Sequence, residues 1–310
     1  MPKRVNSPMN AKKKRLGTKA QIRAEKERER KIATAIFTAL ILIIIIFSAY
    51  FGYQIFSSLP NLSSTSNENL LPAPTQQFKP ANPNPELKAA IVDQLSLTFP
   101  NQTFIEEAAT ILTKANYTVD YYSGEKVTVE FYRNLPTGGY KIIILRVHSS
   151  AAELQGKEFV ETPVGFFTSE PYSQTKYVTE QLANQLVIAS YAMPQPQYYF
   201  AIVPTFVTSS MKGTFQNTAI IMMGCEGLNN TKMAEAFIQK GAKAYIGWKG
   251  SVSASHTDTA TITLLQHLIT EKQTIRQAVE NTMKEVGPDP TYNSTLTYYP
   301  LNIGKQTITP

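Results

Sequence analysis

The pattern of hydrophobic and polar positions divides the chain into an apolar run near the N-terminus, a polar connecting segment and a long body of alternating apolar segments. Residues 32–55 include no charged residue and consist mainly of Ile, Ala, Phe and Leu. Because a helix needs about 20 apolar residues to cross the hydrocarbon core of a bilayer, this run predicts one transmembrane helix. A cleavable signal peptide has a shorter apolar core of about 7–15 residues, and a buried core helix is seldom this long.

Charge predicts how this helix is oriented. Residues 1–31 carry 12 Lys or Arg and three Glu, so the formal net charge of +7 comes from this tail, and the rest of the chain is slightly acidic. Basic residues stay on the cytoplasmic side of a membrane span, which predicts a cytoplasmic tail at 1–31 and a body outside the cell membrane. The lipid bilayer is therefore an expected partner, and the basic tail does not require a nucleic acid to explain it.

The segment after the apolar run, residues 56–86, is rich in Ser, Asn and Pro and shows no hydrophobic periodicity. Such a composition cannot bury enough apolar surface to fold, so we expect a disordered stalk. The N-x-S/T sequons, which accept N-linked glycans, all follow the apolar run, at Asn61, Asn101, Asn116, Asn229 and Asn293. Their distribution agrees with an extracytoplasmic glycoprotein.

The body, residues 87–302, alternates between strand-like and helix-like patterns. Apolar or β-rich runs typical of strands occur at 89–97, 117–122, 141–147, 219–224, 242–248 and 295–299. Helical spacing indicates helices at 104–115, 233–240, 259–270 and 273–286, and Gly241 ends the second of them. Residues 126–135 fit either element, and residues 158–217, rich in aromatics, Thr and Val, indicate a β-rich insertion.

This alternation predicts an α/β fold built on a mostly parallel sheet flanked by helices. The run 141–147, KIIILRV, is apolar at nearly every position, as expected of a strand covered on both faces. The predicted organisation is a transmembrane helix, a stalk and one α/β domain that carries a β-rich insertion.

Two reactive side chains directly follow central strands. His148 comes after the run 141–147, and Cys225, the only cysteine, comes after the run 219–224. Reacting groups of open α/β sheets gather beyond the carboxyl ends of the strands, so these residues form a candidate nucleophile–base pair. The alternatives are that Cys225 is a small buried hydrophobe and that His148 is a structural histidine.

The segment that begins TAIIMMGCEG and continues through AEAF and GAKAYIGW resembles the C-terminal half of caspase-fold cysteine peptidases, of the clostripain, gingipain and CHAT groups. The shared features are a hydrophobic strand that ends in Cys, the helix and strand just quoted, a loop with Ser, Thr and Asp, and paired helices. In that fold the catalytic His ends the preceding core strand, which YKIIILRVHS matches. The resemblance covers residues 88–300, and its specific motifs lie at 141–149 and 218–286.

The resemblance implies a caspase-like three-layer sandwich and a cysteine peptidase that cuts a peptide or protein without a metal or another cofactor. Cys225 is then the nucleophile, and His148 is the general base and acid. The backbone N–H groups of Ser149 and Cys225 would face the oxyanion. An imidazole beside the thiol is expected to raise the thiolate fraction above that of a free cysteine.

The resemblance also implies where the substrate binds. Asp93 ends the first strand at the same edge, and in several groups of this fold an acid near that place forms a pocket for Arg or Lys. Trp248 and Asp258 are expected to line the other wall. The alternative for Asp93 is a solvated loop or cap.

Two residues depart from the family pattern. Ser149 stands where Gly usually follows the catalytic His, and the acid Glu226 directly follows Cys225, where it could raise the thiol pKa. Either fits an inactive relative, so the alternative function is a catalytically inactive surface binding or sensor module of the same fold. Metal binding is not predicted, because His256 and Asp258 are accompanied by no HExxH or CxxC motif.

Overall fold

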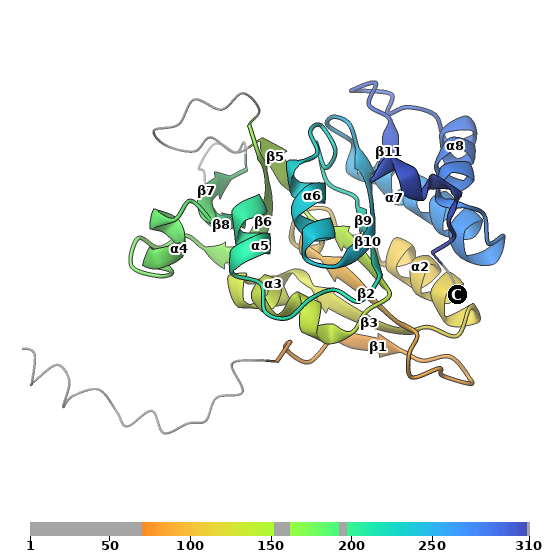
Figure 1. Ribbon diagram of the computed structural model, residues 1–310, viewed down its shortest axis with the longest axis horizontal. Coiled ribbons are helices and arrows are strands. Elements are labelled where there is room, and N and C mark those ends of the chain that lie inside the picture. The colour runs from red at the N-terminus through yellow and green to blue at the C-terminus, as the bar shows by residue number, and fades with distance from the viewer. Residues whose placement is uncertain (1–69, 152–161, 192–196, 309–310) are drawn as a thin grey trace, which may run out of the picture. The chain divides into compact units, whose positions relative to one another are not determined.

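A mostly parallel sheet forms the core of the protein. The computed structural model describes residues 70–151, 162–191 and 197–308, which belong to one unit, Glu68–Pro310. Within them, seven strands form a sheet in the order β1-β3-β2-β4-β9-β10-β11 (Figure 1). The inner strands run parallel, and the edge strands β1 and β11 run antiparallel to their neighbours. The strands are β1 Gln76–Phe78, β2 Lys88–Asp93, β3 Thr118–Ser123, β4 Ile142–Arg146, β9 Thr218–Met222, β10 Ala242–Trp248 and β11 Leu296–Tyr299.

Helices cover both faces of this sheet (Figure 1). One face carries α2 (Gln102–Lys114), α7 (Ala254–Leu265), which continues as a π-helical turn at Gln266–Thr270, and α8 (Ile275–Glu285). The other carries α3 (Val129–Asn134), α5 (Pro204–Ser209) and α6 (Lys232–Gln239). Side chains of a strand alternate between the faces, so Ile144 packs with the first group of helices and Ile143 with the second. The structure confirms the predicted α/β fold, with a mostly parallel sheet between helices.

A smaller antiparallel sheet comes mainly from the stretch predicted to be β-rich. Among the described residues it has four strands in the order β5-β6-β8-β7. They are β5 Ser149–Ala151, β6 Val164–Pro171, β7 Leu186–Ser190 and β8 Tyr198–Ile202. The same stretch also contains α5 and a short helix α4 (Val178–Leu182), which its composition did not indicate. Phe166 and Phe200 pack into the core beneath α5 and α6, so this sheet belongs to the same folded body.

The structure differs from the prediction at the start of the domain. β1 lies inside the segment expected to be a disordered stalk, where it pairs with β3. The Gln77 side-chain amide also donates to Asp120 Oδ1 at 2.5 Å. β1 has only three residues, most of them polar, so its sequence shows no periodic pattern. Pairing with β3 stabilises this strand.

The ambiguous segment 126–135 contains a helix, α3. Its N-cap residue is Thr128, whose side chain accepts a hydrogen bond from the Phe131 N–H. A helix of six residues offers less than two turns of pattern, which is why its period could not be distinguished from that of a strand.

The predicted basic tail, the transmembrane segment at 32–55 and the first part of the stalk lie outside the described residues. Among the helices that the structure does describe, none combines the length and the apolar composition needed to span a bilayer.

Candidate functional site

His148 and Cys225 stand beyond the carboxyl ends of two neighbouring parallel strands, β4 and β9. The register of these strands pairs Leu145 with Met222, and each candidate residue lies three positions beyond that pair. The Cys225 side chain packs against the core on the face that carries α2, α7 and α8. The His148 ring lies against Phe167 of β6 and Tyr191, which follows β7. The backbone therefore brings the two candidates to one edge of the sheet.

Direct contacts hold these two strand ends together. A Cβ atom at Gly224 would lie 2.3 Å from the Val147 carbonyl oxygen, so only glycine permits this close approach. The Ser149 hydroxyl donates to the Cys225 carbonyl at 2.5 Å. The backbone on either side of His148 is thus held against the backbone of Gly224 and Cys225.

The side chains of the two candidates turn in opposite directions. His148 Nε2 shares a hydrogen bond of 2.9 Å with the Thr98 hydroxyl, which follows β2. The Cys225 sulfur lies 3.5 Å from the Val252 carbonyl oxygen and 3.4 Å from the Val252 nitrogen, in the loop that follows β10. β2 and β10 flank the β4–β9 pair on opposite sides. Within the described chain, no hydrogen bond joins the imidazole to the thiol.

Both candidate groups are neutral at neutral pH in this arrangement. Burial, assisted by the positive charge of Arg146, lowers the pKa of His148 from 6.5 to about 4. Burial also raises the pKa of the Cys225 thiol; the hydrogen bond with Val252 opposes this shift, and the charge of Glu226 adds to it. The thiolate fraction is therefore lower than the sequence led us to expect, because His148 faces away from the sulfur.

Glu226 is held close to this site by its own hydrogen bonds. Its backbone has a left-handed conformation, with φ of 60°. One carboxylate oxygen accepts a hydrogen bond of 3.0 Å from the Ala151 N–H, and its own N–H donates to the Gly250 carbonyl. The acid thus ties β5 to the turn after Cys225, a role that its position in the sequence did not indicate.

Asp93 and Asp258 meet at a third residue, Arg146, in the interior below the strand ends. Arg146 Nη1 donates to Asp93 Oδ1 at 2.8 Å, and Nε and Nη2 donate to the two oxygens of Asp258 at 2.7 and 2.8 Å. All three side chains are buried. Burial raises the pKa of Asp93 despite the opposing effect of Arg146. We name Asp93, Arg146 and Asp258 the buried charge cluster.

The buried charge cluster changes the interpretation of the expected substrate pocket. Asp93, expected to form a pocket for a substrate Arg or Lys, and Asp258, expected to line the other wall, already bind an arginine of the protein itself. Sequence reasoning missed Arg146, although a charged residue inside the run KIIILRV had to find a partner, because an unpaired buried charge is very costly.

Trp248, the third residue expected at the substrate, lies in the core. Its side chain is 1% exposed. Its indole N–H donates to the Thr257 hydroxyl at 2.9 Å, and that hydroxyl donates to the Met223 carbonyl. The structure therefore gives Trp248 a role in fixing α7 against the end of β9.

A cleft of about 800 Å³ opens beside His148. Aromatic rings surround the imidazole, with centroids at 4.8 Å for Tyr191, 5.9 Å for Phe167 and 6.0 Å for Phe99. Gln94 orients this wall, because its side chain accepts from the His148 N–H and donates to the Tyr191 hydroxyl. The lining residues are Leu97, Thr98, Phe99, His148, Ser149, Phe167, Ser190, Tyr191, Gln197 and Tyr199.

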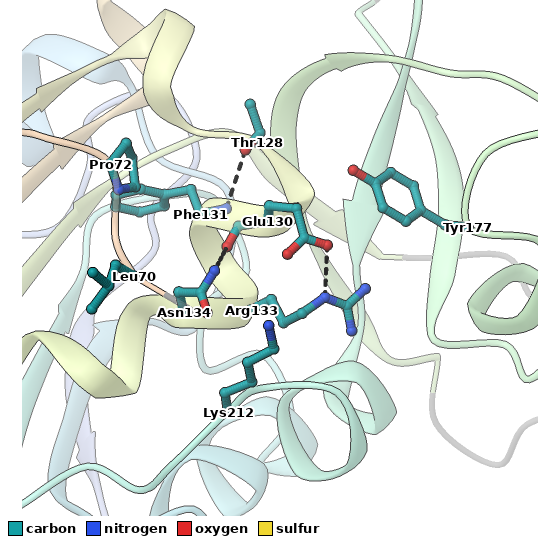
Figure 2. Close-up of a pocket in the computed structure, with 9 residues that line it drawn as sticks. All are labelled: Leu70, Pro72, Thr128, Glu130, Phe131, Arg133, Asn134, Tyr177 and Lys212. Atoms are coloured by element: carbon teal, nitrogen blue, oxygen red, sulfur yellow. Dashed lines mark hydrogen bonds and ion pairs between the residues drawn. The ribbon is translucent and has the colours of Figure 1, made fainter. Parts of the chain in front are cut away.

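A second cavity, of about 650 Å³, lies against α3 (Figure 2). Figure 2 shows the Arg133 guanidinium turned toward Glu130, and the distance from Nε to the carboxylate is 2.8 Å. Arg133 Nη2 also binds Glu180 at 2.6 Å, so its charge is compensated within the protein. His148 lines the first cleft and not this cavity, and we therefore place the candidate site at the first cleft; Cys225 lines neither.

No group of three or more His, Cys, Asp or Glu residues in the described ranges has the arrangement of a metal site. The described side chains that line the cleft offer an imidazole and hydroxyl groups, and the Cys225 thiol lies outside this lining, against Val252.

Replacement of Asp93 by Ala should destabilise the protein, because Arg146 then keeps only one of its two buried carboxylate partners. Removing a partner from a buried ion pair typically costs about 3–5 kcal/mol, and we expect a loss of about 3 kcal/mol in the free energy of unfolding. Urea denaturation followed by the fluorescence of Trp248, the only tryptophan, measures this change. Glu280→Ala, at an exposed acid on α8, is the control and should change stability by less than about 0.5 kcal/mol.

The lowered pKa of His148 predicts acid sensitivity. The unfolded chain takes up the proton near pH 6.5 and the folded protein only near pH 4, so protonation favours unfolding and stability falls as the pH drops through this window. His148→Gln removes this contribution. The free energy of unfolding of the native protein should therefore decrease more between pH 7 and 4.5 than that of the variant, and parallel curves would contradict the assignment.

Two comparisons of this sequence with known proteins found no match. No protein-family model matches it. No curated protein matches it either. The geometry of the cleft and of the two strand ends therefore carries the functional argument.

Proposed function

We propose that the protein is a membrane-anchored cysteine peptidase of caspase-like fold, and that the described arrangement is its resting form. The observation that carries this proposal is the register of β4 and β9, which brings His148 and Cys225 level at one edge of the sheet. The proposal requires both side chains to turn toward each other when a peptide binds. Catalytic hydrogen bonds often form only in the complex with substrate.

The energy needed for this turn is small. His148 gives up its hydrogen bond with Thr98, and Cys225 gives up its contacts with Val252. A typical hydrogen bond contributes about 0.5–1.5 kcal/mol net, so the loss of these three contacts costs about 1.5–4.5 kcal/mol. Millimolar binding of a substrate provides about 4 kcal/mol and micromolar binding about 8 kcal/mol, so interactions of ordinary strength with a substrate are large enough to offset this cost.

In the proposed reaction, His148 accepts the thiol proton as the Cys225 sulfur attacks the carbonyl carbon of the scissile peptide bond. A C–S bond forms, and the tetrahedral oxyanion faces the backbone N–H groups of Ser149 and Cys225. The C–N bond then breaks, and the leaving amine takes the proton from His148. Water, activated by the neutral imidazole, hydrolyses the thioester, which releases the new carboxyl terminus and restores the thiol.

The second candidate is a binding module of the same fold without catalytic activity. The observation in its favour is that the imidazole and the thiol are both held neutral and turned apart. Under that function a ligand occupies the cleft at His148 and Cys225 stays protonated. The two candidates differ in whether the thiol reacts when a peptide electrophile is bound.

Substitution of the dyad tests the peptidase. The full-length protein should hydrolyse a mixed peptide library, Cys225→Ser should stop cleavage, and His148→Ala should slow it by about 10²-fold or more. The measurement is mass spectrometry of the cleaved peptides. Cleavage that survives in Cys225→Ser would come from another enzyme, and a folded native protein that cleaves nothing would favour the binding module.

Membrane anchoring rests on the uncharged run at 32–55 and on the basic tail before it. In a chain without the native thiol, Cys225→Ala, we expect Ser63→Cys to react with a membrane-impermeant maleimide on intact cells. Ser7→Cys should react only after the cells are lysed, because the tail is cytoplasmic. Labelling in the opposite order would reverse the orientation.

A further inference from the structure

The cleft beside His148 indicates which side chain the proposed peptidase accepts. We infer that it binds an aromatic or large apolar side chain of the substrate next to the cleaved bond, and not a basic or acidic one. This inference rests on the proposed peptidase function, because His148 in the wall of the cleft is the group that would act on the adjacent bond.

The walls of the cleft are built from rings in contact with one another. Phe167 and Tyr191 have centroids 5.6 Å apart, and Tyr191 and Tyr199 are 5.2 Å apart. Such spacing is typical of aromatic pairs, and another ring can join them through edge or offset contacts. Because His148 packs against Tyr191 at 4.8 Å, a ring bound among these residues would lie beside the imidazole.

The described lining of the cleft offers no counter-charge to a basic or an acidic side chain. None of the described residues that line it is Asp, Glu, Lys or Arg. Asp93 and Asp258, the acids expected at the substrate, are both bound to Arg146 and are buried below the strand ends. Glu226 does not line the cleft, and its carboxylate accepts a hydrogen bond from the Ala151 N–H. A lysine or arginine side chain would lose its hydration here without gaining a counter-charge, which is unfavourable.

The rim and the size of the cleft agree with a large apolar occupant. Leu97 and Phe99 are 45% and 54% exposed, although side chains of this kind gain stability when they are covered. Both lie in the segment between β2 and α2, and Phe99 is fixed there because its carbonyl accepts a hydrogen bond from Arg146. A volume of about 800 Å³ has room for a side chain as large as that of Phe or Tyr together with part of the peptide backbone.

Three peptidyl acyloxymethyl ketones that differ only in the residue next to the electrophile test the inference. They carry Phe, Lys or Asp, and intact-protein mass spectrometry measures the rate at which each labels Cys225 of the full-length protein. We expect the Phe probe to react at least about tenfold faster than the other two, a difference that corresponds to about 1.4 kcal/mol.

The possible outcomes separate the inference from the function on which it rests. Fastest labelling by the Lys or Asp probe, or equal rates for all three, overturns the inference and leaves the peptidase standing. Labelling by no probe overturns the peptidase and the inference with it.

Substitutions at two exposed aromatic residues test whether the cleft is the place where the substrate side chain binds. Phe99→Asp places a carboxylate at the rim without disturbing the core, and it should shift the ratio of Phe to Lys labelling by at least about tenfold toward Lys. Tyr292→Asp is the matched control, because Tyr292 is 55% exposed and does not line the cleft; its ratio should equal that of the native protein. An unchanged ratio in Phe99→Asp would show that the side chain binds elsewhere.

Discussion

The arrangement of the carboxyl edge of the sheet depends on the hydrogen bonds and ion pairs that the buried Arg146 guanidinium makes. Its hydrogen bonds reach the end of β2 through Asp93, α7 through Asp258 and the cleft rim through the carbonyl of Phe99. Moving charges out of water costs several kcal/mol for each ion, and only close, well-directed pairing offsets that cost. The hydrogen bond that Arg146 donates to the Phe99 carbonyl therefore sets the position of the rim more than the packing of the exposed rim side chains does.

The same cation affects the chemistry above it. Its charge adds to burial in making the His148 imidazole a weak base. A weak base accepts the thiol proton reluctantly, but its protonated form is a correspondingly strong acid toward a leaving amine. In the proposed peptidase, Arg146 would hinder the first proton transfer and assist the second.

Sequence periodicity predicted the inner strands and the longer helices because each of them buries a continuous apolar face. The expected strand at 242–248 is β10, Ala242–Trp248. The position of His148 and Cys225 beyond neighbouring strands could also be predicted, since parallel strands end at one edge. The direction of their side chains could not, because it is set by partners 50 and 27 residues away, Thr98 and Val252. The edge strand β1 and the pairing of Asp93 with Arg146 likewise depend on contacts that a local pattern does not contain.

The contact of the Cys225 sulfur with Val252 has a consequence for the lifetime of the protein. Peroxides and disulfides attack the thiolate and hardly the protonated thiol, and access to the sulfur limits the rate further. A sulfur that is partly buried and protonated is therefore oxidised slowly. The peptidase that we propose, placed outside the cell membrane and with Cys225 as its only cysteine, would have no second thiol of its own with which to form and later release a protective disulfide. Keeping the sulfur turned into the protein until a substrate arrives would limit the time during which it can be lost to irreversible oxidation.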